Sequence, residues 1–461
     1  MILKNSKLVL TIEALSGDGQ GIAHSDGQVV FVPYTAEGDV VEVHIIKATK
    51  TYAVGKVVNI ITPSKKRICI DCTAFGKCGG CSLRHISLDE EQKIKTQSVK
   101  DVMERIGGIK VEVDDALITP HDAYRNKAQL PVTEERGELK CGFFASFSHR
   151  IVEGSLNCLA TPKIFSDIAG KIIDFLKDKS LKGYDEKSGQ GLLRHLYMRI
   201  NRNGKIMLCL VLNSRELVNS ETEQVFVEYI TTAFPDIVSV FVNENTKNTN
   251  AILGEKFRLL FGTEYFEDEL LGVRLCMSPD SFFQVNREGA ELVYKTAFSM
   301  LEGKNFENVY DLYCGVGSIG LTLFSEIKKG NLNVDVKRLF GVEIVQNAVK
   351  WAKHNAKINK IENANFYTSD STDITKMELF DQFPPSLVIL DPPRKGTTET
   401  LLKYLSDKNV GNILYISCNP ATLARDMSFL YKEGYTADKV VPVNLFPRTS
   451  HVECCVLLCR S

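Results

Sequence analysis

Three short stretches in the C-terminal half of the chain carry side chains that can do chemistry. Ser417-Cys-Asn-Pro420 supplies a thiol, Asp391-Pro-Pro-Arg394 a carboxylate, and Glu453 a second carboxylate. A thiolate can act as a nucleophile, and a carboxylate can accept a proton. All three lie downstream of a glycine loop, Asp311-Leu-Tyr-Cys-Gly-Val-Gly-Ser318, which is typical of a nucleoside-cofactor site. We therefore expect covalent catalysis beside a bound cofactor.

Few reactions need both a thiolate and a methyl donor, and the foremost adds a methyl group to carbon 5 of a pyrimidine. A thiolate that adds to carbon 6 of uracil makes carbon 5 nucleophilic, and a base then removes the carbon-5 proton so that the thiolate can leave. Cys418 follows a predicted strand at 412–417 and precedes a predicted helix at 421–433. Because a helix N-terminus lowers the pKa of a nearby thiol, we predict an activated nucleophile here. The other cysteines of this half are interpreted as small buried hydrophobes.

The glycine loop belongs to an alternation of helices and strands that predicts a doubly wound α/β sheet. A helix is expected at 290–301, and strands at 309–311, 339–343, 364–367, 386–391 and 412–417. Ligands of such sheets bind at the carboxyl ends of the strands. Glu343 and Asp370 follow the second and third strands, where they can accept hydrogen bonds from ribose hydroxyls and an adenine amino group.

The same loop excludes two other cofactor classes. It lacks the Gly-Lys-Ser/Thr of a phosphate-binding loop, and no downstream motif supplies hydride chemistry. Gly315 and Glu343 are 28 residues apart, more than the usual separation of about 20, and the polar stretch at 328–337 accounts for the excess as a surface insertion. S-adenosylmethionine is the cofactor that fits best.

Composition limits the class of protein. The chain has 461 residues, enough for two to four domains, with 44% hydrophobic and 25% charged residues. No signal peptide and no apolar run near the length of a membrane span is found, so no membrane partner is expected. Thirteen cysteines without a secretory signal predict reduced thiols and a cytoplasmic location. No obligate protein partner is evident.

Two basic runs stand out against a net charge of −1. One is Lys65-Lys-Arg67, and the other, at 192–205, carries no acidic residue. A solvated strand face is the ordinary explanation of such a run. Because the two runs flank a cluster of cysteines, they favour an RNA partner. The second run contains Arg194, His195, Arg199, Arg202 and Lys205.

Residues 1–61 predict a small barrel of the oligonucleotide-binding (OB) type, because five short β-segments alternate with turns. This stretch resembles the TRAM domain, an RNA-binding barrel, at Gly17-Asp-Gly-Gln-Gly-Ile-Ala23, Phe31-Val-Pro33 and Gly38-Asp39. A barrel used only for packing is the alternative. Residues 62–270 predict a central domain with a helix at 89–106, strands at 193–201 and 205–212, and a helix at 221–234. Residues 271–461 form the doubly wound domain.

The run Leu390-Asp-Pro-Pro-Arg-Lys-Gly396, together with the segment at 415–426, resembles the RNA uracil-5-methyltransferase family. The branch that carries a TRAM domain and an iron–sulfur cluster and acts on 23S ribosomal RNA is the most similar, over essentially the whole chain. The resemblance implies a Rossmann-like class I methyltransferase domain, an N-terminal OB-fold (TRAM) barrel and a central α+β domain with a [4Fe–4S] cluster.

The resemblance also assigns roles to residues. Cys418 is the nucleophile and Glu453 the base, although a purely structural carboxylate at a strand edge is a competing interpretation of Glu453. Ser318 departs from the Asn of some relatives. The residues expected to contact S-adenosylmethionine or the target base are Gln284, Tyr313, Ser318, Glu343, Asp370 and Asp391.

The cysteines at the start of the central domain allow two metal sites. Cys69, Cys72, Cys78 and Cys81 form C-x2-C-x5-C-x2-C, a spacing that suits a zinc knot. The family pattern instead implies that Cys72, Cys78 and Cys81 join Cys158 to hold a [4Fe–4S] cluster. Since methyl transfer needs no redox step, we expect a structural cluster that shapes the RNA-binding surface.

We therefore predict S-adenosylmethionine-dependent methylation of carbon 5 of a specific uridine in 23S ribosomal RNA. Uracils inside a helix cannot present carbon 6 to a thiolate, so the target is expected in a loop or flipped from a stack. The alternatives are 5-methyluridine formation in transfer RNA, 5-methylcytosine formation in RNA, and a non-catalytic RNA-binding assembly factor. Cys418, Glu453 and Asp391 together favour an enzyme, because a binding protein needs no such set.

Overall fold

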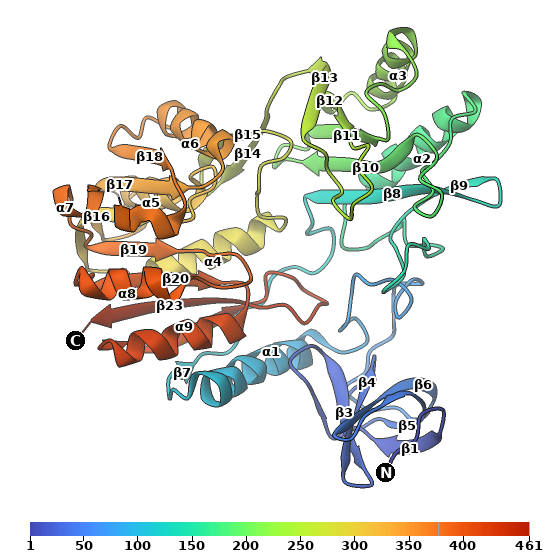
Figure 1. The fold of residues 1–461 in the computed structure, drawn as a ribbon, viewed down its shortest axis with the longest axis horizontal. Coiled ribbons are helices and arrows are strands. Elements are labelled where there is room, and N and C mark those ends of the chain that lie inside the picture. The colour runs from blue at the N-terminus through green and yellow to red at the C-terminus, as the bar shows by residue number, and fades with distance from the viewer. Residues whose placement is uncertain (377, 461) are drawn as a thin grey trace.

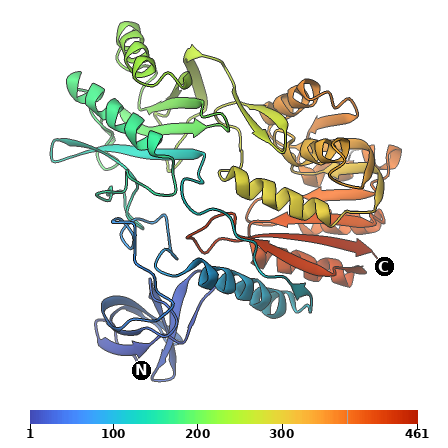
Figure 2. The ribbon, with the colours of Figure 1, turned by 180° about the vertical axis from the view of Figure 1, so that it is seen from behind.

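A computed structural model describes residues 1–376 and 378–460. Three parts of the chain surround a common centre (Figure 1). The N-terminal barrel lies beneath, the central domain above it, and the C-terminal sheet with its helices to one side. Seen from behind, α1 (Leu88–Val102) runs from the barrel along the C-terminal sheet (Figure 2). In the described part of the chain, no helix is both long and apolar enough to cross a membrane.

The N-terminal sheet has six strands, one more than the five segments predicted, because residues on both sides of the Gly17–Gly21 turn form a hairpin. Alternate residues of β3, β4 and β5 are buried, as a one-sided sheet requires. The strand order is β1-β5-β6-β4-β3-β2. The strands are β1 (Lys7–Thr11), β2 (Ala14–Leu15), β3 (Gln20–Ser25), β4 (Gln28–Pro33), β5 (Val40–Ala48) and β6 (Tyr52–Thr62).

Helix α1 fixes the segment that leads to Glu453. Ser87 caps it by accepting a hydrogen bond from the Glu90 amide, and a π-helical turn, η1 (Met103–Gly107), extends it. Inside the protein, Lys95 of α1 pairs with Glu91 at 3.0 Å and donates to Asn444 Oδ1 at 2.5 Å. Glu91 also accepts from the Arg448 amide at 2.9 Å. Because these groups are buried, removing one would leave an unpaired partner.

The central domain is a mixed sheet covered on one face by two helices. Its strand order is β13-β12-β11-β10-β8-β9. Apolar residues of β8 and β10 pack against α2 on this face. The elements are β8 (Lys127–Glu135), β9 (Glu138–Cys141), α2 (Lys163–Asp178), β10 (Leu193–Ile200), β11 (Ile206–Leu212), α3 (Ser220–Ala233), β12 (Ile237–Glu244) and β13 (Lys256–Gly262).

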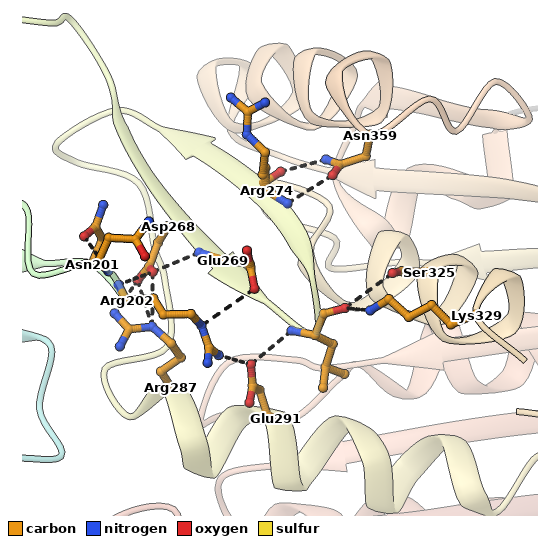
Figure 3. Close-up of polar contacts among 12 residues, drawn as sticks. Asn201, Arg202, Asp268, Glu269, Arg274, Arg287, Glu291, Ser325, Lys329 and Asn359 are labelled. Carbon is orange, nitrogen blue, oxygen red and sulfur yellow. Dashed lines mark hydrogen bonds and ion pairs between the residues drawn. The ribbon is translucent and has the colours of Figure 1, made fainter. Parts of the chain in front are cut away.

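A hairpin of β14 (Phe266–Leu270) and β15 (Val273–Met277) connects the central and C-terminal domains (Figure 3). Asp268 accepts hydrogen bonds from the Arg202 amide of the central domain and from the Arg287 side chain. The backbone of Arg274 exchanges two hydrogen bonds with the Asn359 side chain. The predicted boundary between residues 270 and 271 falls in the turn of this hairpin.

The C-terminal domain is a doubly wound α/β sheet, which confirms the predicted fold class. Its order is β18-β17-β16-β19-β20-β23-β22-β7, and β21 pairs with β23. The strands from β18 to β20 are parallel, and β23 runs antiparallel to β20. The order reverses beside β16 (Asn305–Asp311), between β17 (Asp335–Glu343) and β19 (Leu387–Leu390). Such a switch point opens a ligand crevice at the carboxyl ends of the strands.

The remaining elements follow the predicted alternation of strands and helices. The helix predicted at 290–301 begins earlier, at Arg287, because Asn286 caps it by accepting from the Gly289 amide. The elements are β7 (Glu112–Val113), α4 (Arg287–Ser299), α5 (Ser318–Lys328), α6 (Gln346–Ile358), β18 (Ala364–Thr368), η2 (Ser371–Lys376), α7 (Leu379–Gln382), α8 (Glu399–Asp407), β20 (Asn412–Ser417), α9 (Pro420–Lys432), β21 (Tyr435–Thr436), β22 (Lys439–Val443) and β23 (Glu453–Arg460).

Candidate active site

The glycine loop joins β16 to α5 in a conformation that only glycine adopts freely. Gly315 and Gly317 have φ of 54° and 84°. The Gly315 amide donates to Glu343 Oε2 at 3.1 Å, and Glu343 Oε1 accepts from the Val345 amide at 2.8 Å. The Glu343 carboxylate therefore lies against the loop at the carboxyl end of β17, where the sequence predicted it.

The other predicted cofactor residues lie along the same edge of the sheet. Tyr313 shares a hydrogen bond of 2.9 Å with Thr397, and Ser318 one of 3.2 Å with Tyr294. Asp370 follows β18, is exposed, and accepts from the amide and hydroxyl of Thr372. The loop that leads into α5 is thus fastened to the loop after β19.

Gln284 lies in the loop between β15 and α4, and the central domain holds this loop in place. Asn126 Nδ2 donates to the Gln284 carbonyl at 2.9 Å, and the Asn126 amide to Val285 O at 2.7 Å. The buried guanidinium of Arg199 donates to the Ser281 carbonyl. Sequence reasoning missed Asn126 and interpreted Arg199 only as part of a basic run, because their contacts span more than 80 residues and no local pattern reveals them.

Cys418 and Glu453 meet at the edge where β20 ends. In the antiparallel pair of β20 and β23, Ser417 lies opposite Cys454. Cys418 directly follows Ser417 and Glu453 directly precedes Cys454, so both lie at this end of the strand pair. The charge of Glu453 accordingly contributes to the pKa of Cys418. A thiol and a carboxyl from two strands therefore face one site.

Three carboxyl groups gather in this corner, and none of them forms an ion pair with a described residue. Burial raises the pKa of Asp391 to about 7. Burial and the Asp391 charge raise the pKa of Asp311 to about 7 and that of Glu453 to about 8. Asp311 Oδ1 has no hydrogen-bond partner among the described residues. Excess buried negative charge of this kind suits a cationic ligand.

The pKa of Cys418 differs from the prediction. We expected the N-terminus of α9 to lower it, but burial and the charges of Glu453 and Asp391 raise it to about 11. Asn419 caps α9 by accepting from the Ala421 amide, so a side chain already satisfies this helix end. The prediction of an activated thiol was therefore wrong for the free protein.

Arg394 is the positive group of the corner, and sequence reasoning assigned it no role. Its charge lowers the pKa of both Cys418 and Glu453. The Arg394 carbonyl accepts from Asn419 Nδ2 at 2.9 Å, and its guanidinium lies 3.3 Å from His451 Nε2. The arginine of Asp391-Pro-Pro-Arg394 was itself the signal, because a cation three positions from a carboxyl can reach the same site.

The cysteines of the central domain line a cavity of about 750 Å³. Cys72, Cys78, Cys81 and Cys158 all belong to its wall. Burial raises the pKa of Cys81 to about 11, and the charges of Cys158, Cys78 and Cys72 contribute. Four neighbouring thiols are the donor set of an iron–sulfur cluster.

Cys69, which the zinc alternative requires, is exposed and lies outside the described wall of this cavity. Across residues 1–376 and 378–460, no group of three or more His, Cys, Asp or Glu side chains is arranged as a metal-ligand set. The fit to a cluster therefore depends on the chemistry of the four thiols and on their common cavity.

Known proteins match both ends of the chain and its whole length. Residues 253–461 match the family model of tRNA (uracil-5-)-methyltransferases, and residues 4–58 match that of the TRAM domain. An uncharacterized RNA methyltransferase of Halalkalibacterium halodurans is 36% identical over 458 residues, 99% of this chain and 97% of the relative. One of Clostridium tetani is 38% identical over 463 residues, with the same shares covered.

Among solved structures, the tRNA (uracil-54, C5)-methyltransferase of Pyrococcus abyssi, in complex with S-adenosyl-L-homocysteine, is similar. Its TM-score is 0.74 at 26% identity, covering 98% of this chain and 100% of that one. The strand order and glycine loop thus define a class I methyltransferase. The chain belongs to the TRAM-domain RNA uracil-5-methyltransferase family, and it is an S-adenosylmethionine-dependent RNA (uracil-5-)-methyltransferase.

Proposed function

We propose that the protein methylates carbon 5 of a specific uridine in 23S ribosomal RNA through a covalent adduct between Cys418 and carbon 6 of the base. The observation that carries this proposal is that Cys418 and Glu453 lie at the same end of the β20–β23 pair, close enough for the charges of Glu453, Asp391 and Arg394 to act on the thiol. A nucleophile, a proton acceptor and a cation that favours the thiolate then surround one position for the base.

The reaction forms and breaks a bond to the cysteine sulfur in turn. The Cys418 thiolate forms a bond to carbon 6, and carbon 5 attacks the methyl carbon of S-adenosylmethionine. The sulfonium–methyl bond breaks and leaves S-adenosylhomocysteine. Glu453 accepts the carbon-5 proton, and the bond between carbon 6 and Cys418 breaks to release 5-methyluridine and the thiolate. Arg394 favours the ionised forms of both protein groups.

The methyl donor fits the edge formed by β16, β17 and β18. We propose that Glu343 binds the ribose, that Asp370 accepts from the adenine amino group, and that Gln284, Tyr313 and Ser318 contact the remainder. The partly unpaired carboxyl corner supports this placement, because S-adenosylmethionine carries a sulfonium cation. Asp391 is assigned to the donor or to an edge of the target base.

Loss of the thiol tests the covalent step. Cys418→Ala is expected to abolish methylation and the adduct with RNA that contains 5-fluorouridine, while S-adenosylmethionine still binds. Cys459→Ala, at the far end of β23, is the matched control and is expected to form the adduct normally. Turnover of Cys418→Ala within about tenfold of the wild type would overturn the mechanism, because loss of a nucleophile costs far more.

Ribosomal RNA is proposed because the TRAM barrel and the cysteine cluster resemble the ribosomal branch of the family. Transfer RNA is the second candidate, favoured by the family model's description and by the Pyrococcus abyssi structure. The uracil family model favours uridine over cytidine as the target. Mass mapping of 5-methyluridine in ribosomal and transfer RNA from a deletion strain would separate the two: the modification is expected to vanish from 23S RNA, and its loss from transfer RNA alone would reassign the substrate.

We further propose that Cys72, Cys78, Cys81 and Cys158 hold a [4Fe–4S] cluster. When bound, it would cross-link the loop at 72–81 to the distant segment around Cys158 and so stiffen one wall of the cavity. No step of methyl transfer passes through it.

Two serine variants test the ligand set. Cys158→Ser is expected to lose the brown colour, iron and acid-labile sulfide, because a cluster that lacks a ligand becomes exposed and labile. Cys69→Ser is expected to keep all three. The opposite pattern, with zinc bound and Cys158 dispensable, would replace the cluster with a zinc knot.

A further inference from the structure

The cavity beside the cysteines has a second wall that the proposed function leaves unused. It is formed by one face of the central sheet, including Lys127 and Gln129 of β8 and His195 of β10. Alternation along β8 turns Ala128 and Leu130 to the other face, where they pack against α2. The polar side chains of these strands therefore point into the cavity and away from the core.

Lys127, Arg125 and Arg194 bring positive charge to this wall, where Arg194 pairs with Glu186 at 3.6 Å. Lys127 lies directly opposite Arg199 in the register of β8 and β10. Like charges at such a pair destabilise a sheet. Burial and the charges of Arg199 and Arg125 lower the pKa of Lys127 to about 8. Within residues 1–376 and 378–460, no carboxylate pairs with Lys127, Arg125 or Arg199.

Two more nitrogen-bearing side chains of β10 reach the same cavity. The register shifts between Leu193 and His195, and this irregularity lets the consecutive residues Arg194 and His195 both line it. Both are buried. Arg194 Nε and His195 Nδ1 have no hydrogen-bond partner in the described part of the chain. Buried polar atoms without partners indicate a ligand or water that the cavity receives.

Aromatic side chains form the opposite wall, on the turn that follows β9. Phe144 and His149 of this turn are in edge contact, with ring centroids 5.4 Å apart. Phe147 at its tip is fully exposed and has φ of 56°, a strained conformation for a bulky residue. An exposed ring beside cationic groups is the arrangement that stacks single-stranded bases.

Arg125, His451 and Arg394 connect this cavity to the catalytic corner, and because burial and neighbouring cations lower the pKa of His451, the two arginines supply the positive charge. The charge of Arg125, which reaches Lys127, also reaches His451. His451 contacts Arg394, whose charge reaches Cys418 and Glu453. The segment before Glu453 also accepts two amide hydrogen bonds from the cysteine loop, from Ser82 and Leu83 to Arg448 O, both at 3.0 Å.

We propose that this cavity is a second nucleotide site, which takes a phosphodiester of the RNA on Lys127 and Arg125 and stacks the attached base on Phe147. It receives a nucleotide of the strand that carries the target uridine. That placement along the strand rests on the proposed position of the target at Cys418. The binding chemistry itself does not, because phosphate and aromatic contacts act on any single-stranded RNA.

Salt dependence of binding tests the phosphate contact. Affinity for a fluorescein-labelled single-stranded RNA of mixed sequence would be measured at several salt concentrations for the wild type and Lys127→Gln. The slope of log affinity against log salt is expected to become shallower by about 0.7, the contribution of one phosphate contact. Lys127→Arg is expected to keep the slope. Lys177→Gln, which removes an exposed lysine of α2 on the opposite side of the sheet, is the matched control and should also keep it.

Phe147→Ala tests the base contact with a different signature. It is expected to weaken binding about tenfold, with an unchanged salt slope, because stacking involves no counterion release. Equal slopes for Lys127→Gln and the wild type, in protein that still binds S-adenosylmethionine, would overturn the site. So would competition by a phosphopeptide but not by RNA. Neither result would bear on the Cys418 mechanism, which the 5-fluorouridine adduct tests separately.

Discussion

The catalytic corner and the cavity of the central domain are electrostatic opposites. The corner gathers the carboxyl groups of Asp311, Asp391 and Glu453, and burial raises the pKa of each. The cavity gathers the cationic side chains of Lys127 and Arg125, with which no carboxylate among the described residues forms an ion pair, and that of Arg194, which pairs with Glu186. Both regions concentrate one sign of charge out of water, which costs stability in the free protein.

One chain with a net charge of −1 can thus bind ligands of opposite sign in two separate regions. The acidic corner suits the cationic methyl donor, and the basic cavity suits the anionic substrate. The overall charge reveals neither site, because it is the difference between 56 basic and 57 acidic residues spread over the whole chain. Arg394 lies at the junction, where its charge reaches Cys418 and Glu453 and its guanidinium contacts His451.

The largest effect is expected when the proton acceptor is removed from the acidic corner. Glu453→Gln should permit addition and methyl transfer but stall elimination, so that a protein–RNA adduct accumulates on denaturing gels. Steady-state turnover should fall about 10²–10⁴-fold, the usual contribution of a general base. Glu362→Gln, at an exposed position, is the control. Normal product release from Glu453→Gln would reassign the proton to another group or to water.

A smaller effect is expected on binding of the donor. Asp391→Asn should lower the affinity for S-adenosylmethionine more than the affinity for S-adenosylhomocysteine, since only the former has a charged sulfur. The affinity for S-adenosylmethionine is expected to fall about tenfold, in keeping with the loss of a hydrogen bond or contact to a charged group. Titration calorimetry with both ligands measures the ratio, with exposed Asp407→Asn as the control. Equal losses for the two ligands would argue against charge complementarity in the corner.

The smallest effect is expected on the pH dependence of the unfolding free energy. The folded-state pKa values of Asp311, Asp391 and Glu453, about 7, 7 and 8, lie above the ordinary values of 3.8 and 4.5. The folded state therefore binds more protons, so the unfolding free energy should fall as the pH rises from about 4 through 8. Melting curves of the ligand-free protein at pH 5.5 and 8.5 measure this, and Asp391→Asn should flatten the dependence. A melting temperature that rises with pH in the wild type would contradict the charged corner.

Much of the site was predictable because it depends on local constraints. Gly315 and Gly317 occupy left-handed backbone positions that a tight strand-to-helix turn imposes, so their spacing alone located the loop. Cys418 and Glu343 were predicted at strand ends because parallel strands of a doubly wound sheet point their carboxyl ends the same way. The family resemblance added the remaining site residues, and their roles stay predictions.

Only the tertiary structure determines burial and long-range contacts, which local sequence patterns do not reveal. The basic run at 192–205 was interpreted as favouring RNA over a solvated face, but only the strand register shows that Arg194, His195 and Arg199 are buried and that Arg199 faces Lys127. The predicted direction of the shift in the Cys418 pKa was wrong for the same reason. The sequence shows a helix start nearby, whereas the pKa depends on desolvation and on the charges of Glu453 and Asp391, which lie at the ends of the two strands that flank β20.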